Sequence, residues 1–170
     1  MGGGSVGQLV QQVARRAGVA HVTMVEPSPF RRSIAAQLGA DEAVTPFDAR
    51  EQADAQQLEP FDHVFECSGH ADALQLSIDL LAAGGSVRLV GMAPRPVSFD
   101  SVSAITKEIS ILTGFIYNAE FAAAIPLLAS GAIDVDPLTT TVVDLDHYAE
   151  AFEALHEPEH TLKALIGSGP

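Results

Sequence analysis

The amino-terminal stretch Gly2-Gly3-Gly4-Ser5-Val6-Gly7 fits the pattern G-x-G-x-x-G at Gly2, Gly4 and Gly7. In this pattern the first glycine permits a tight turn, the second lets a pyrophosphate approach the backbone, and the third lets a helix pack closely on a strand. A helix that follows such a loop presents free N–H groups and about half a positive charge at its amino terminus. The spacing therefore predicts a phosphate site that needs no basic side chain. A glycine-rich start is also typical of flexible ends or tag remnants.

Glu26 is the second candidate for chemistry, because it ends the next predicted strand, 19 residues after Gly7. A carboxylate there can accept hydrogen bonds from an adenosine ribose and repel a 2′-phosphate. A strand that ends on an acid is common by chance. Loop, helix, strand and acid in this order nevertheless favour a dinucleotide site, with NAD preferred over NADP.

The histidines and the single cysteine do not form a metal pattern. His156 and His160 are four residues apart, but Pro158 lies between them and breaks the helix that would place both rings on one face. Cys67 ends a predicted strand, where a lone cysteine is usually a small buried hydrophobe. We therefore expect no zinc site within these 170 residues, since a catalytic zinc needs three protein ligands and one open position.

Predicted strands and helices alternate along the chain, which indicates a parallel sheet covered on both faces. We expect a Rossmann-like, doubly wound α/β domain over residues 1–117 and a small appendage over 118–170. The helices are expected at 5–17, 30–38, 48–58, 71–82, 119–129 and 146–155, and the strands at 21–26, 43–45, 62–67, 86–91, 109–115, 139–144 and 161–166.

One element of that fold is not in the sequence. A dinucleotide-binding domain has a strand immediately before the glycine loop, in the middle of its sheet, but only Met1 precedes Gly2 here. Either the chain has lost that strand or its native start lies upstream of Met1. Without the strand, strands 21–26 and 62–67 would face each other across about two inter-strand spacings, roughly 9–10 Å, with unpaired backbone edges.

Composition narrows the class of protein. Nine basic against 22 acidic residues leave a formal net charge of −13, which opposes a broad nucleic-acid or anionic-membrane surface. No apolar run approaches the roughly 18 residues of a membrane span, and the first 20 residues lack the apolar core of a signal peptide. A single cysteine suits a reducing compartment, so we expect a cytoplasmic protein.

Six stretches, in this order and at these distances, resemble the C-terminal half of zinc-dependent medium-chain alcohol/polyol dehydrogenases. They are GGGSVG, VEPSPFRRSIAAQLGADEAV, FDHVFECSG, LLAAGGSVRLVGM, GFIYNAEFAAAIPLLASGAI and HTLKALI. The resemblance covers nearly the whole chain, and Glu-Pro-Ser after the second strand is most similar to the butanediol, sorbitol and threonine dehydrogenase branch. It implies that NAD is the cofactor and that the appendage returns to a catalytic domain.

The resemblance also implies roles for individual residues. The pyrophosphate would lie on Gly2, Gly4, Ser5, Val6 and Gly7, and the adenosine beside Glu26, Arg31, Cys67, Ser68 and Gly69. The nicotinamide would lie beside Val90, Gly91, Met92, Gly114, Phe115 and Ile116, with Lys163 reaching the pyrophosphate from the appendage.

In the family, the zinc ligands and the proton relay lie in the N-terminal half, and none of them has a counterpart in this sequence. The leading interpretation is the NAD-binding half of an alcohol or polyol dehydrogenase, whose substrate the sequence does not specify. A truncated, non-catalytic module that binds nucleotides and oligomerises is an alternative, and a SAM-dependent methyltransferase is a weaker one. The apolar strand candidate within Ile109–Ile116 (ISILTGFI) predicts a homo-oligomer, because an exposed apolar edge invites pairing.

Overall fold

The computed structural model describes residues 1–117, 119–157 and 159–167. Its first part follows the order α1 (Ser5–Arg16), β1 (Thr23–Val25), α2 (Pro29–Gln37), β2 (Glu42–Val44), α3 (Pro46–Asp54), β3 (Phe61–Glu66), α4 (Ala73–Leu80), β4 (Leu81–Leu89), α5 (Ser101–Thr106) and β5 (Ser110–Thr113). Then come α6 (Phe121–Ala129), η1 (Asp136–Leu138), β6 (Thr141–Asp144), η2 (Leu145–His147), α7 (Tyr148–Leu155) and β7 (Ala164–Gly167).

Helices α2 and α3 begin where the sequence supplies side-chain caps. Thr45 accepts from the Asp48 N–H while the Asp48 carboxylate accepts from the Thr45 N–H, and the pair forms a capping box at the start of α3. Ser28 caps α2, with Pro29 as its first residue. The predicted helices are confirmed to within a few residues. The short helix α5 was not predicted, because its six residues carry no clear apolar repeat.

The strands form three separate parallel sheets, with the orders β1-β2, β3-β4-β5 and β6-β7. Val25 pairs with Val44 in the first sheet, and Val87 pairs with both Val64 and Ile111 in the second. The break between β1 and β3 falls where a central strand was expected to be missing. β4 begins at Leu81, five residues before the predicted start, after an irregular register opposite Phe61–His63.

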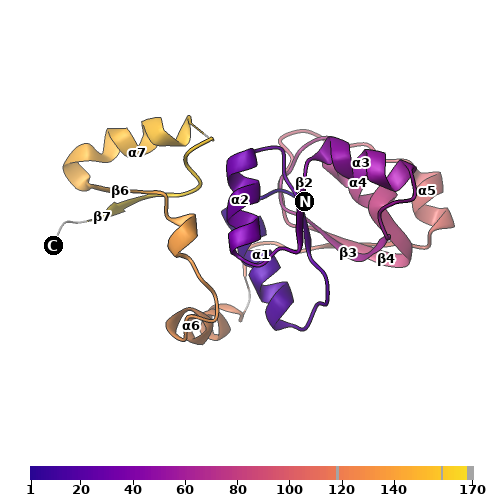
Figure 1. Ribbon diagram of the computed structural model, residues 1–170, viewed down its shortest axis with the longest axis horizontal. Helices are drawn as coiled ribbons and strands as arrows, with labels where there is room; N and C mark the ends of the chain where they lie inside the picture. Colours follow the sequence, from indigo (N-terminus) through magenta and orange to yellow (C-terminus); the bar gives the residue numbers. More distant parts are fainter. Residues whose placement is uncertain (118, 158, 168–170) are drawn as a thin grey trace.

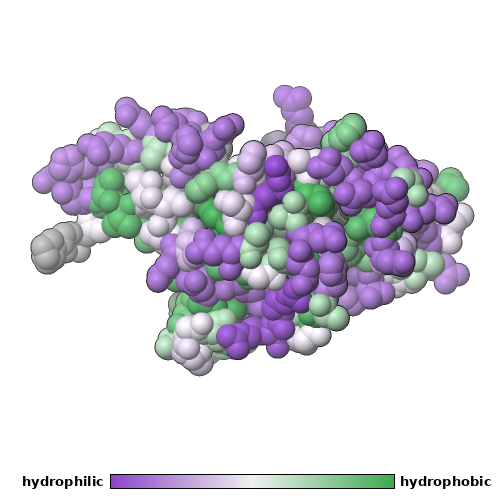
Figure 2. Space-filling model, viewed as in Figure 1, coloured by the Kyte–Doolittle hydropathy of each residue, from purple (hydrophilic) through white to green (hydrophobic). Residues whose placement is uncertain are grey.

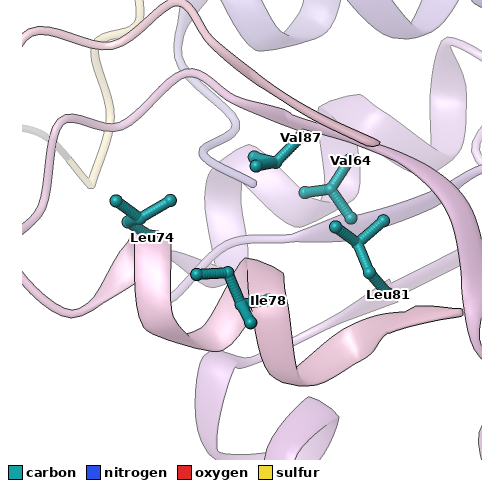
Figure 3. Packing of buried hydrophobic residues seen from close by; sticks show 5 residues of the cluster. All are labelled: Val64, Leu74, Ile78, Leu81 and Val87. Carbon is teal, nitrogen blue, oxygen red and sulfur yellow. The ribbon is translucent and has the colours of Figure 1, made fainter. Parts of the chain in front are cut away.

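The core lies between α4 and the β3-β4 ladder (Figure 3). Ile78 and Val87 are fully buried, and Leu81 is 1% exposed. Burial of each such side chain stabilises the fold by about 1.5–3 kcal/mol before entropic costs are counted. Together with Val64 and Leu74 these residues hold the three-stranded sheet in place, so the loops at its carboxyl edge have a rigid base.

Helices α6 and α7 and the β6-β7 pair lie to one side of the main body (Figure 1). Leu138 and Leu162 of this segment are buried against Ile34 of α2, with Leu9 and Phe30 at the margin of the same cluster. Gln12 adds a reciprocal pair of bonds to the Asp134 backbone, at 2.8 and 2.7 Å. The carboxyl-terminal segment is therefore anchored on α1 and α2.

The structure places no helix in its described residues that is long and apolar enough to cross a membrane. On the face shown in Figure 2, hydrophobic residues form patches between hydrophilic ones.

Candidate dinucleotide site

The glycine loop closes on itself so tightly that two of its positions cannot carry a side chain. A Cβ on Gly7 would lie 1.8 Å from the carbonyl oxygen of Gly2. Gly2 has φ +85°, and a Cβ there would lie 2.9 Å from the Ser68 backbone. The loop therefore packs both against α1 and against the turn after β3, which is the tight turn that the spacing predicted.

Gly4 has a different role. It is the N-cap of α1, and a Cβ on it would meet nothing within 4 Å. The N–H groups of the first helical turn have no acceptor inside a helix, and they carry the positive end of its dipole. Gly4 thus leaves open space over an anion-binding helix terminus, as a phosphate cradle requires.

Backbone hydrogen bonds hold the loop at the carboxyl ends of two strands. The Gly2 N–H donates to the Val25 carbonyl at 2.8 Å, on the β1 side. The Cys67 N–H donates to the Met1 carbonyl at 2.9 Å, and the Met1 ammonium donates to the Phe65 carbonyl at 2.9 Å, both on the β3 side. Met1 and Gly2 therefore join two strands that belong to different sheets.

Glu26 is buried beside the loop, with only 4% of its surface exposed. Its Oε2 accepts the Gly3 N–H at 2.6 Å, and its Oε1 accepts the Ser28 N–H at 2.9 Å. The carboxylate therefore positions the glycine loop and the turn into α2, a function that the sequence did not reveal. Each oxygen keeps a lone pair, so a ribose hydroxyl can still bond to it. The ribose role stays a prediction.

The two arginines at the start of α2 differ in their contacts. Arg32 donates to the carbonyls of Glu26 and Pro27 at 2.8 and 2.7 Å, so it stabilises the β1–α2 turn instead of lying on a solvated helix face. Arg31, which was singled out for ligand contact, has a buried Nε without a hydrogen-bond partner. A buried donor without a partner is costly, and an acceptor on a bound ligand would remove that cost.

Glu66 organises the turn after β3. It is 3% exposed, and its Oε1 accepts from the Ser68 N–H at 2.7 Å, the Ser68 hydroxyl at 2.5 Å and the Gly69 N–H at 3.0 Å. Its backbone carbonyl accepts from the N–H groups of Val90 and Gly91. This buried carboxylate inside an apolar strand is therefore a structural anchor for the turns after β3 and β4.

Glycines also let the turns after β3 and β4 touch. A Cβ on Gly91 would lie 2.3 Å from the Gly69 nitrogen, and a Cβ on Gly69 would lie 2.5 Å from the Met92 carbonyl oxygen. Contacts from Glu26 through the glycine loop to Ser68, Gly69 and Gly91 are continuous. The structure thus brings these predicted site residues together at the carboxyl ends of β1, β3 and β4.

Val90, Met92, Gly114, Phe115 and Ile116 line a cavity of about 590 Å³ at the carboxyl ends of β4 and β5. Its wall is completed by Arg88, Tyr117 and Glu120. Phe115 and Ile116 are strongly exposed, at 77% and 76%. Five of the six residues assigned to the nicotinamide side therefore share one mostly apolar hollow, and Gly91 does not line it.

The two remaining predicted residues, Cys67 and Lys163, make no side-chain contact among the described residues that supports a role at the site. Burial raises the pKa of the Cys67 thiol, so this cysteine stays protonated and is a weak nucleophile. Lys163 is exposed, and its backbone carbonyl accepts from Thr140. No contact in the described part of the chain joins Lys163 to the glycine loop, and its pyrophosphate role stays a prediction.

Residues 1–117, 119–157 and 159–167 contain no group of three or more His, Cys, Asp or Glu side chains that could hold a metal ion. Pro158, which separates His156 from His160, lies outside the described residues.

A parallel sheet, a glycine loop that enters a helix, and an acid at the end of the next strand define a Rossmann-type domain of the dinucleotide-binding class. Residues 5–130 match the family model described as zinc-binding dehydrogenase. The chain belongs to this family, and the membership removes the methyltransferase alternative.

Three relatives illustrate the match. An L-threonine 3-dehydrogenase of Pyrococcus furiosus is 33% identical over 161 residues, which are 91% of this chain and 46% of the relative. The crystal structure of L-idonate 5-dehydrogenase from Escherichia coli superposes with a TM-score of 0.89 at 28% identity, over 98% of this chain and 48% of the other. The crystal structure of a zinc-binding-dehydrogenase-type protein of Sinorhizobium meliloti, bound to NADP, superposes with a TM-score of 0.85 at 30% identity. The match covers 97% of this chain and 50% of the other. The chain spans about half the length of the curated relatives it matches.

Proposed function

We propose that this chain is the NAD-binding half of a zinc-type alcohol or polyol dehydrogenase. The observation that carries the proposal is the glycine loop, in which Gly7 cannot hold a side chain while Gly4 leaves open space at the start of α1. The pyrophosphate would bind there, the adenosine ribose would face Glu26, and Arg31 Nε would gain an acceptor. The names of the L-threonine and L-idonate dehydrogenases support a small alcohol as the substrate class of the whole enzyme.

The protein's part in this chemistry is positioning. When bound, NAD would accept the hydride, and the chain would orient it along the edge formed by the turns after β1, β3 and β4. The cavity at Val90, Met92 and Phe115 would exclude water from the nicotinamide. We further propose that residues 118–170 form the segment that returns to a zinc-bearing half, and that Lys163 reaches the pyrophosphate when that half is present.

A titration and an assay on the purified, tag-free chain test this proposal. We expect NADH to bind, as followed by calorimetry, and secondary alcohols not to be oxidised, because no described donor set can hold zinc and lower the pKa of an alcohol. Elemental analysis on the same sample should find much less than one zinc per chain. Absence of NADH binding would refute the function, and turnover with stoichiometric zinc would refute the assignment as a cofactor-binding half.

Selectivity for NAD is expected to depend on Glu26. We expect Glu26→Ala to narrow the NAD/NADP affinity ratio by about tenfold, because like-charge repulsion of the 2′-phosphate is removed. The ratio is the correct readout, since losing the bond to Gly3 would disturb the pyrophosphate loop equally for both cofactors. Glu42→Ala, at an exposed acid in β2, serves as the control. An unchanged ratio would remove Glu26 from this role.

We also propose that the chain associates through the edge of β5. All four residues of this strand are exposed, and Ile111 and Leu112 retain 37% and 41% of their surface. An apolar strand at a sheet edge is a template for pairing with a second copy. We expect a dimer or larger species in sedimentation at tens of micromolar and a monomer for Leu112→Lys. A wild-type chain that sediments as a monomer would contradict this proposal.

A further inference from the structure

Arg88 places a cation in the cavity at the carboxyl ends of β4 and β5, here called the β4–β5 cavity. Val87 of the same strand is fully buried in the cluster that packs on α4, so Arg88 and Val90 lie on the opposite face of the sheet. They are two positions apart, about 6.6 Å along the strand, and both line the cavity. Among the described residues of its lining, Arg88 is the only lysine or arginine.

The guanidinium of Arg88 extends from β4 to the end of β5. Its Nη1 donates to the Thr113 carbonyl at 3.2 Å, although the residue paired with Arg88 in the ladder is Leu112. A Cβ on Gly114 would lie 3.8 Å from the same nitrogen. The hydrogen bond therefore holds the positive charge beside the turn after β5, which also lines the cavity.

The charge of Arg88 is permanent, because a guanidinium does not lose its proton in proteins. Val90, Met92 and Phe115 make much of the surrounding wall apolar, and a bound ring would displace water from it. A charge interaction is stronger where less water screens it. Arg88 itself is exposed, so some screening remains and the effect depends on ionic strength.

The two oxidation states of the cofactor differ in charge at the nicotinamide. The ring is cationic in NAD⁺ and neutral in NADH, whereas the adenosine and pyrophosphate are the same in both. In the overall reaction the alcohol carbon gives a hydride to the ring, the alcohol becomes a carbonyl compound, and its hydroxyl proton is released. A fixed cation beside the ring therefore repels the oxidised form and not the reduced one.

We propose that Arg88 determines the preference between these oxidation states, because its guanidinium lowers the affinity for NAD⁺ relative to NADH. The inference rests on the proposed function, since it requires the nicotinamide to lie in the β4–β5 cavity. NAD⁺ bound beside this charge is a stronger hydride acceptor. In the complete enzyme, Arg88 would then favour oxidation of the alcohol over reduction of the carbonyl compound.

Calorimetric titration of the intact chain with NAD⁺, NADH and ADP-ribose tests the proposal. The measured quantity is the Kd of NAD⁺ divided by the Kd of NADH, and Arg88→Gln should lower this ratio by about threefold to tenfold. Arg88→Lys keeps a positive charge, so its ratio should stay within about twofold of wild type. ADP-ribose lacks the nicotinamide, and its Kd should change less than about twofold in both variants, which excludes damage to the rest of the site.

Two further variants separate a local charge from a change in net charge. Arg50→Gln is the matched control, because Arg50 is an exposed arginine on α3 that does not line the cavity, and its ratio should equal that of wild type. Glu120→Gln removes a negative charge from the cavity wall and should not lower the ratio. At about 1 M salt the difference between wild type and Arg88→Gln should shrink, because the Debye length falls to about 3 Å.

The three ligands distinguish the ways in which the proposal can fail. An unchanged ratio in Arg88→Gln, while all three ligands bind, would overturn this inference and leave the proposed function intact. An equal loss of affinity for NAD⁺ and NADH would also overturn it, because a hydrogen bond to the carboxamide acts on both forms alike. If the wild-type chain binds none of the three ligands, the proposed function is refuted and this inference with it.

Discussion

Gly4→Ala is expected to weaken NADH binding by about tenfold or more while the free energy of unfolding stays within about 1 kcal/mol of wild type. A Cβ on Gly4 meets nothing within 4 Å in the free protein, and the backbone there is extended, with φ −68° and ψ 179°. The added methyl group would occupy the space that the proposal assigns to the pyrophosphate. Calorimetry with NADH and urea unfolding of the same sample give the two quantities.

Gly7→Ala makes the comparison within one loop. A Cβ on Gly7 would lie 1.8 Å from the Gly2 carbonyl oxygen, so the loop itself must move. We expect this variant to lose both NADH binding and several kcal/mol of stability. If Gly4→Ala binds NADH as well as wild type does, the pyrophosphate does not lie over the start of α1, whatever Gly7→Ala does.

Glu66→Ala is expected to lower the free energy of unfolding by about 2–4 kcal/mol. The buried carboxylate accepts two backbone N–H groups and one hydroxyl, from Ser68 and Gly69. Its removal leaves the buried Gly69 N–H without an acceptor and a void beneath the turns after β3 and β4. Urea unfolding followed by circular dichroism measures the loss.

Glu51→Ala provides the matched control for Glu66→Ala, because Glu51 is an exposed glutamate on α3. Its stability should stay within about 0.5 kcal/mol of wild type. Glu66→Gln keeps one acceptor oxygen, so its free energy of unfolding should fall between those of Glu66→Ala and Glu51→Ala. If Glu66→Ala unfolds at the wild-type urea concentration, the hydrogen bonds to Ser68 and Gly69 do not anchor the turn.

The sequence by itself determined the features that depend on local spacing. The positions of Gly2, Gly4 and Gly7, the caps of α2 and α3, and the alternation of strands with helices follow from the preferences of neighbouring residues. These signals depend on a few neighbouring residues, so the sequence alone is enough to predict them.

Tertiary structure decided how the residues at the site work together. Spacing indicated a ribose-binding acid at Glu26, but only the fold shows that its carboxylate also fixes Gly3 and Ser28, which lie on different turns. Likewise, the apolar repeat of α1 predicted the helix but not that Gln8 and Gln11 would be buried while Val13 stays exposed. Which face of a helix is covered depends on elements distant in the sequence. Here α2 covers the glutamines, while the valines line the cavity between β1 and β3.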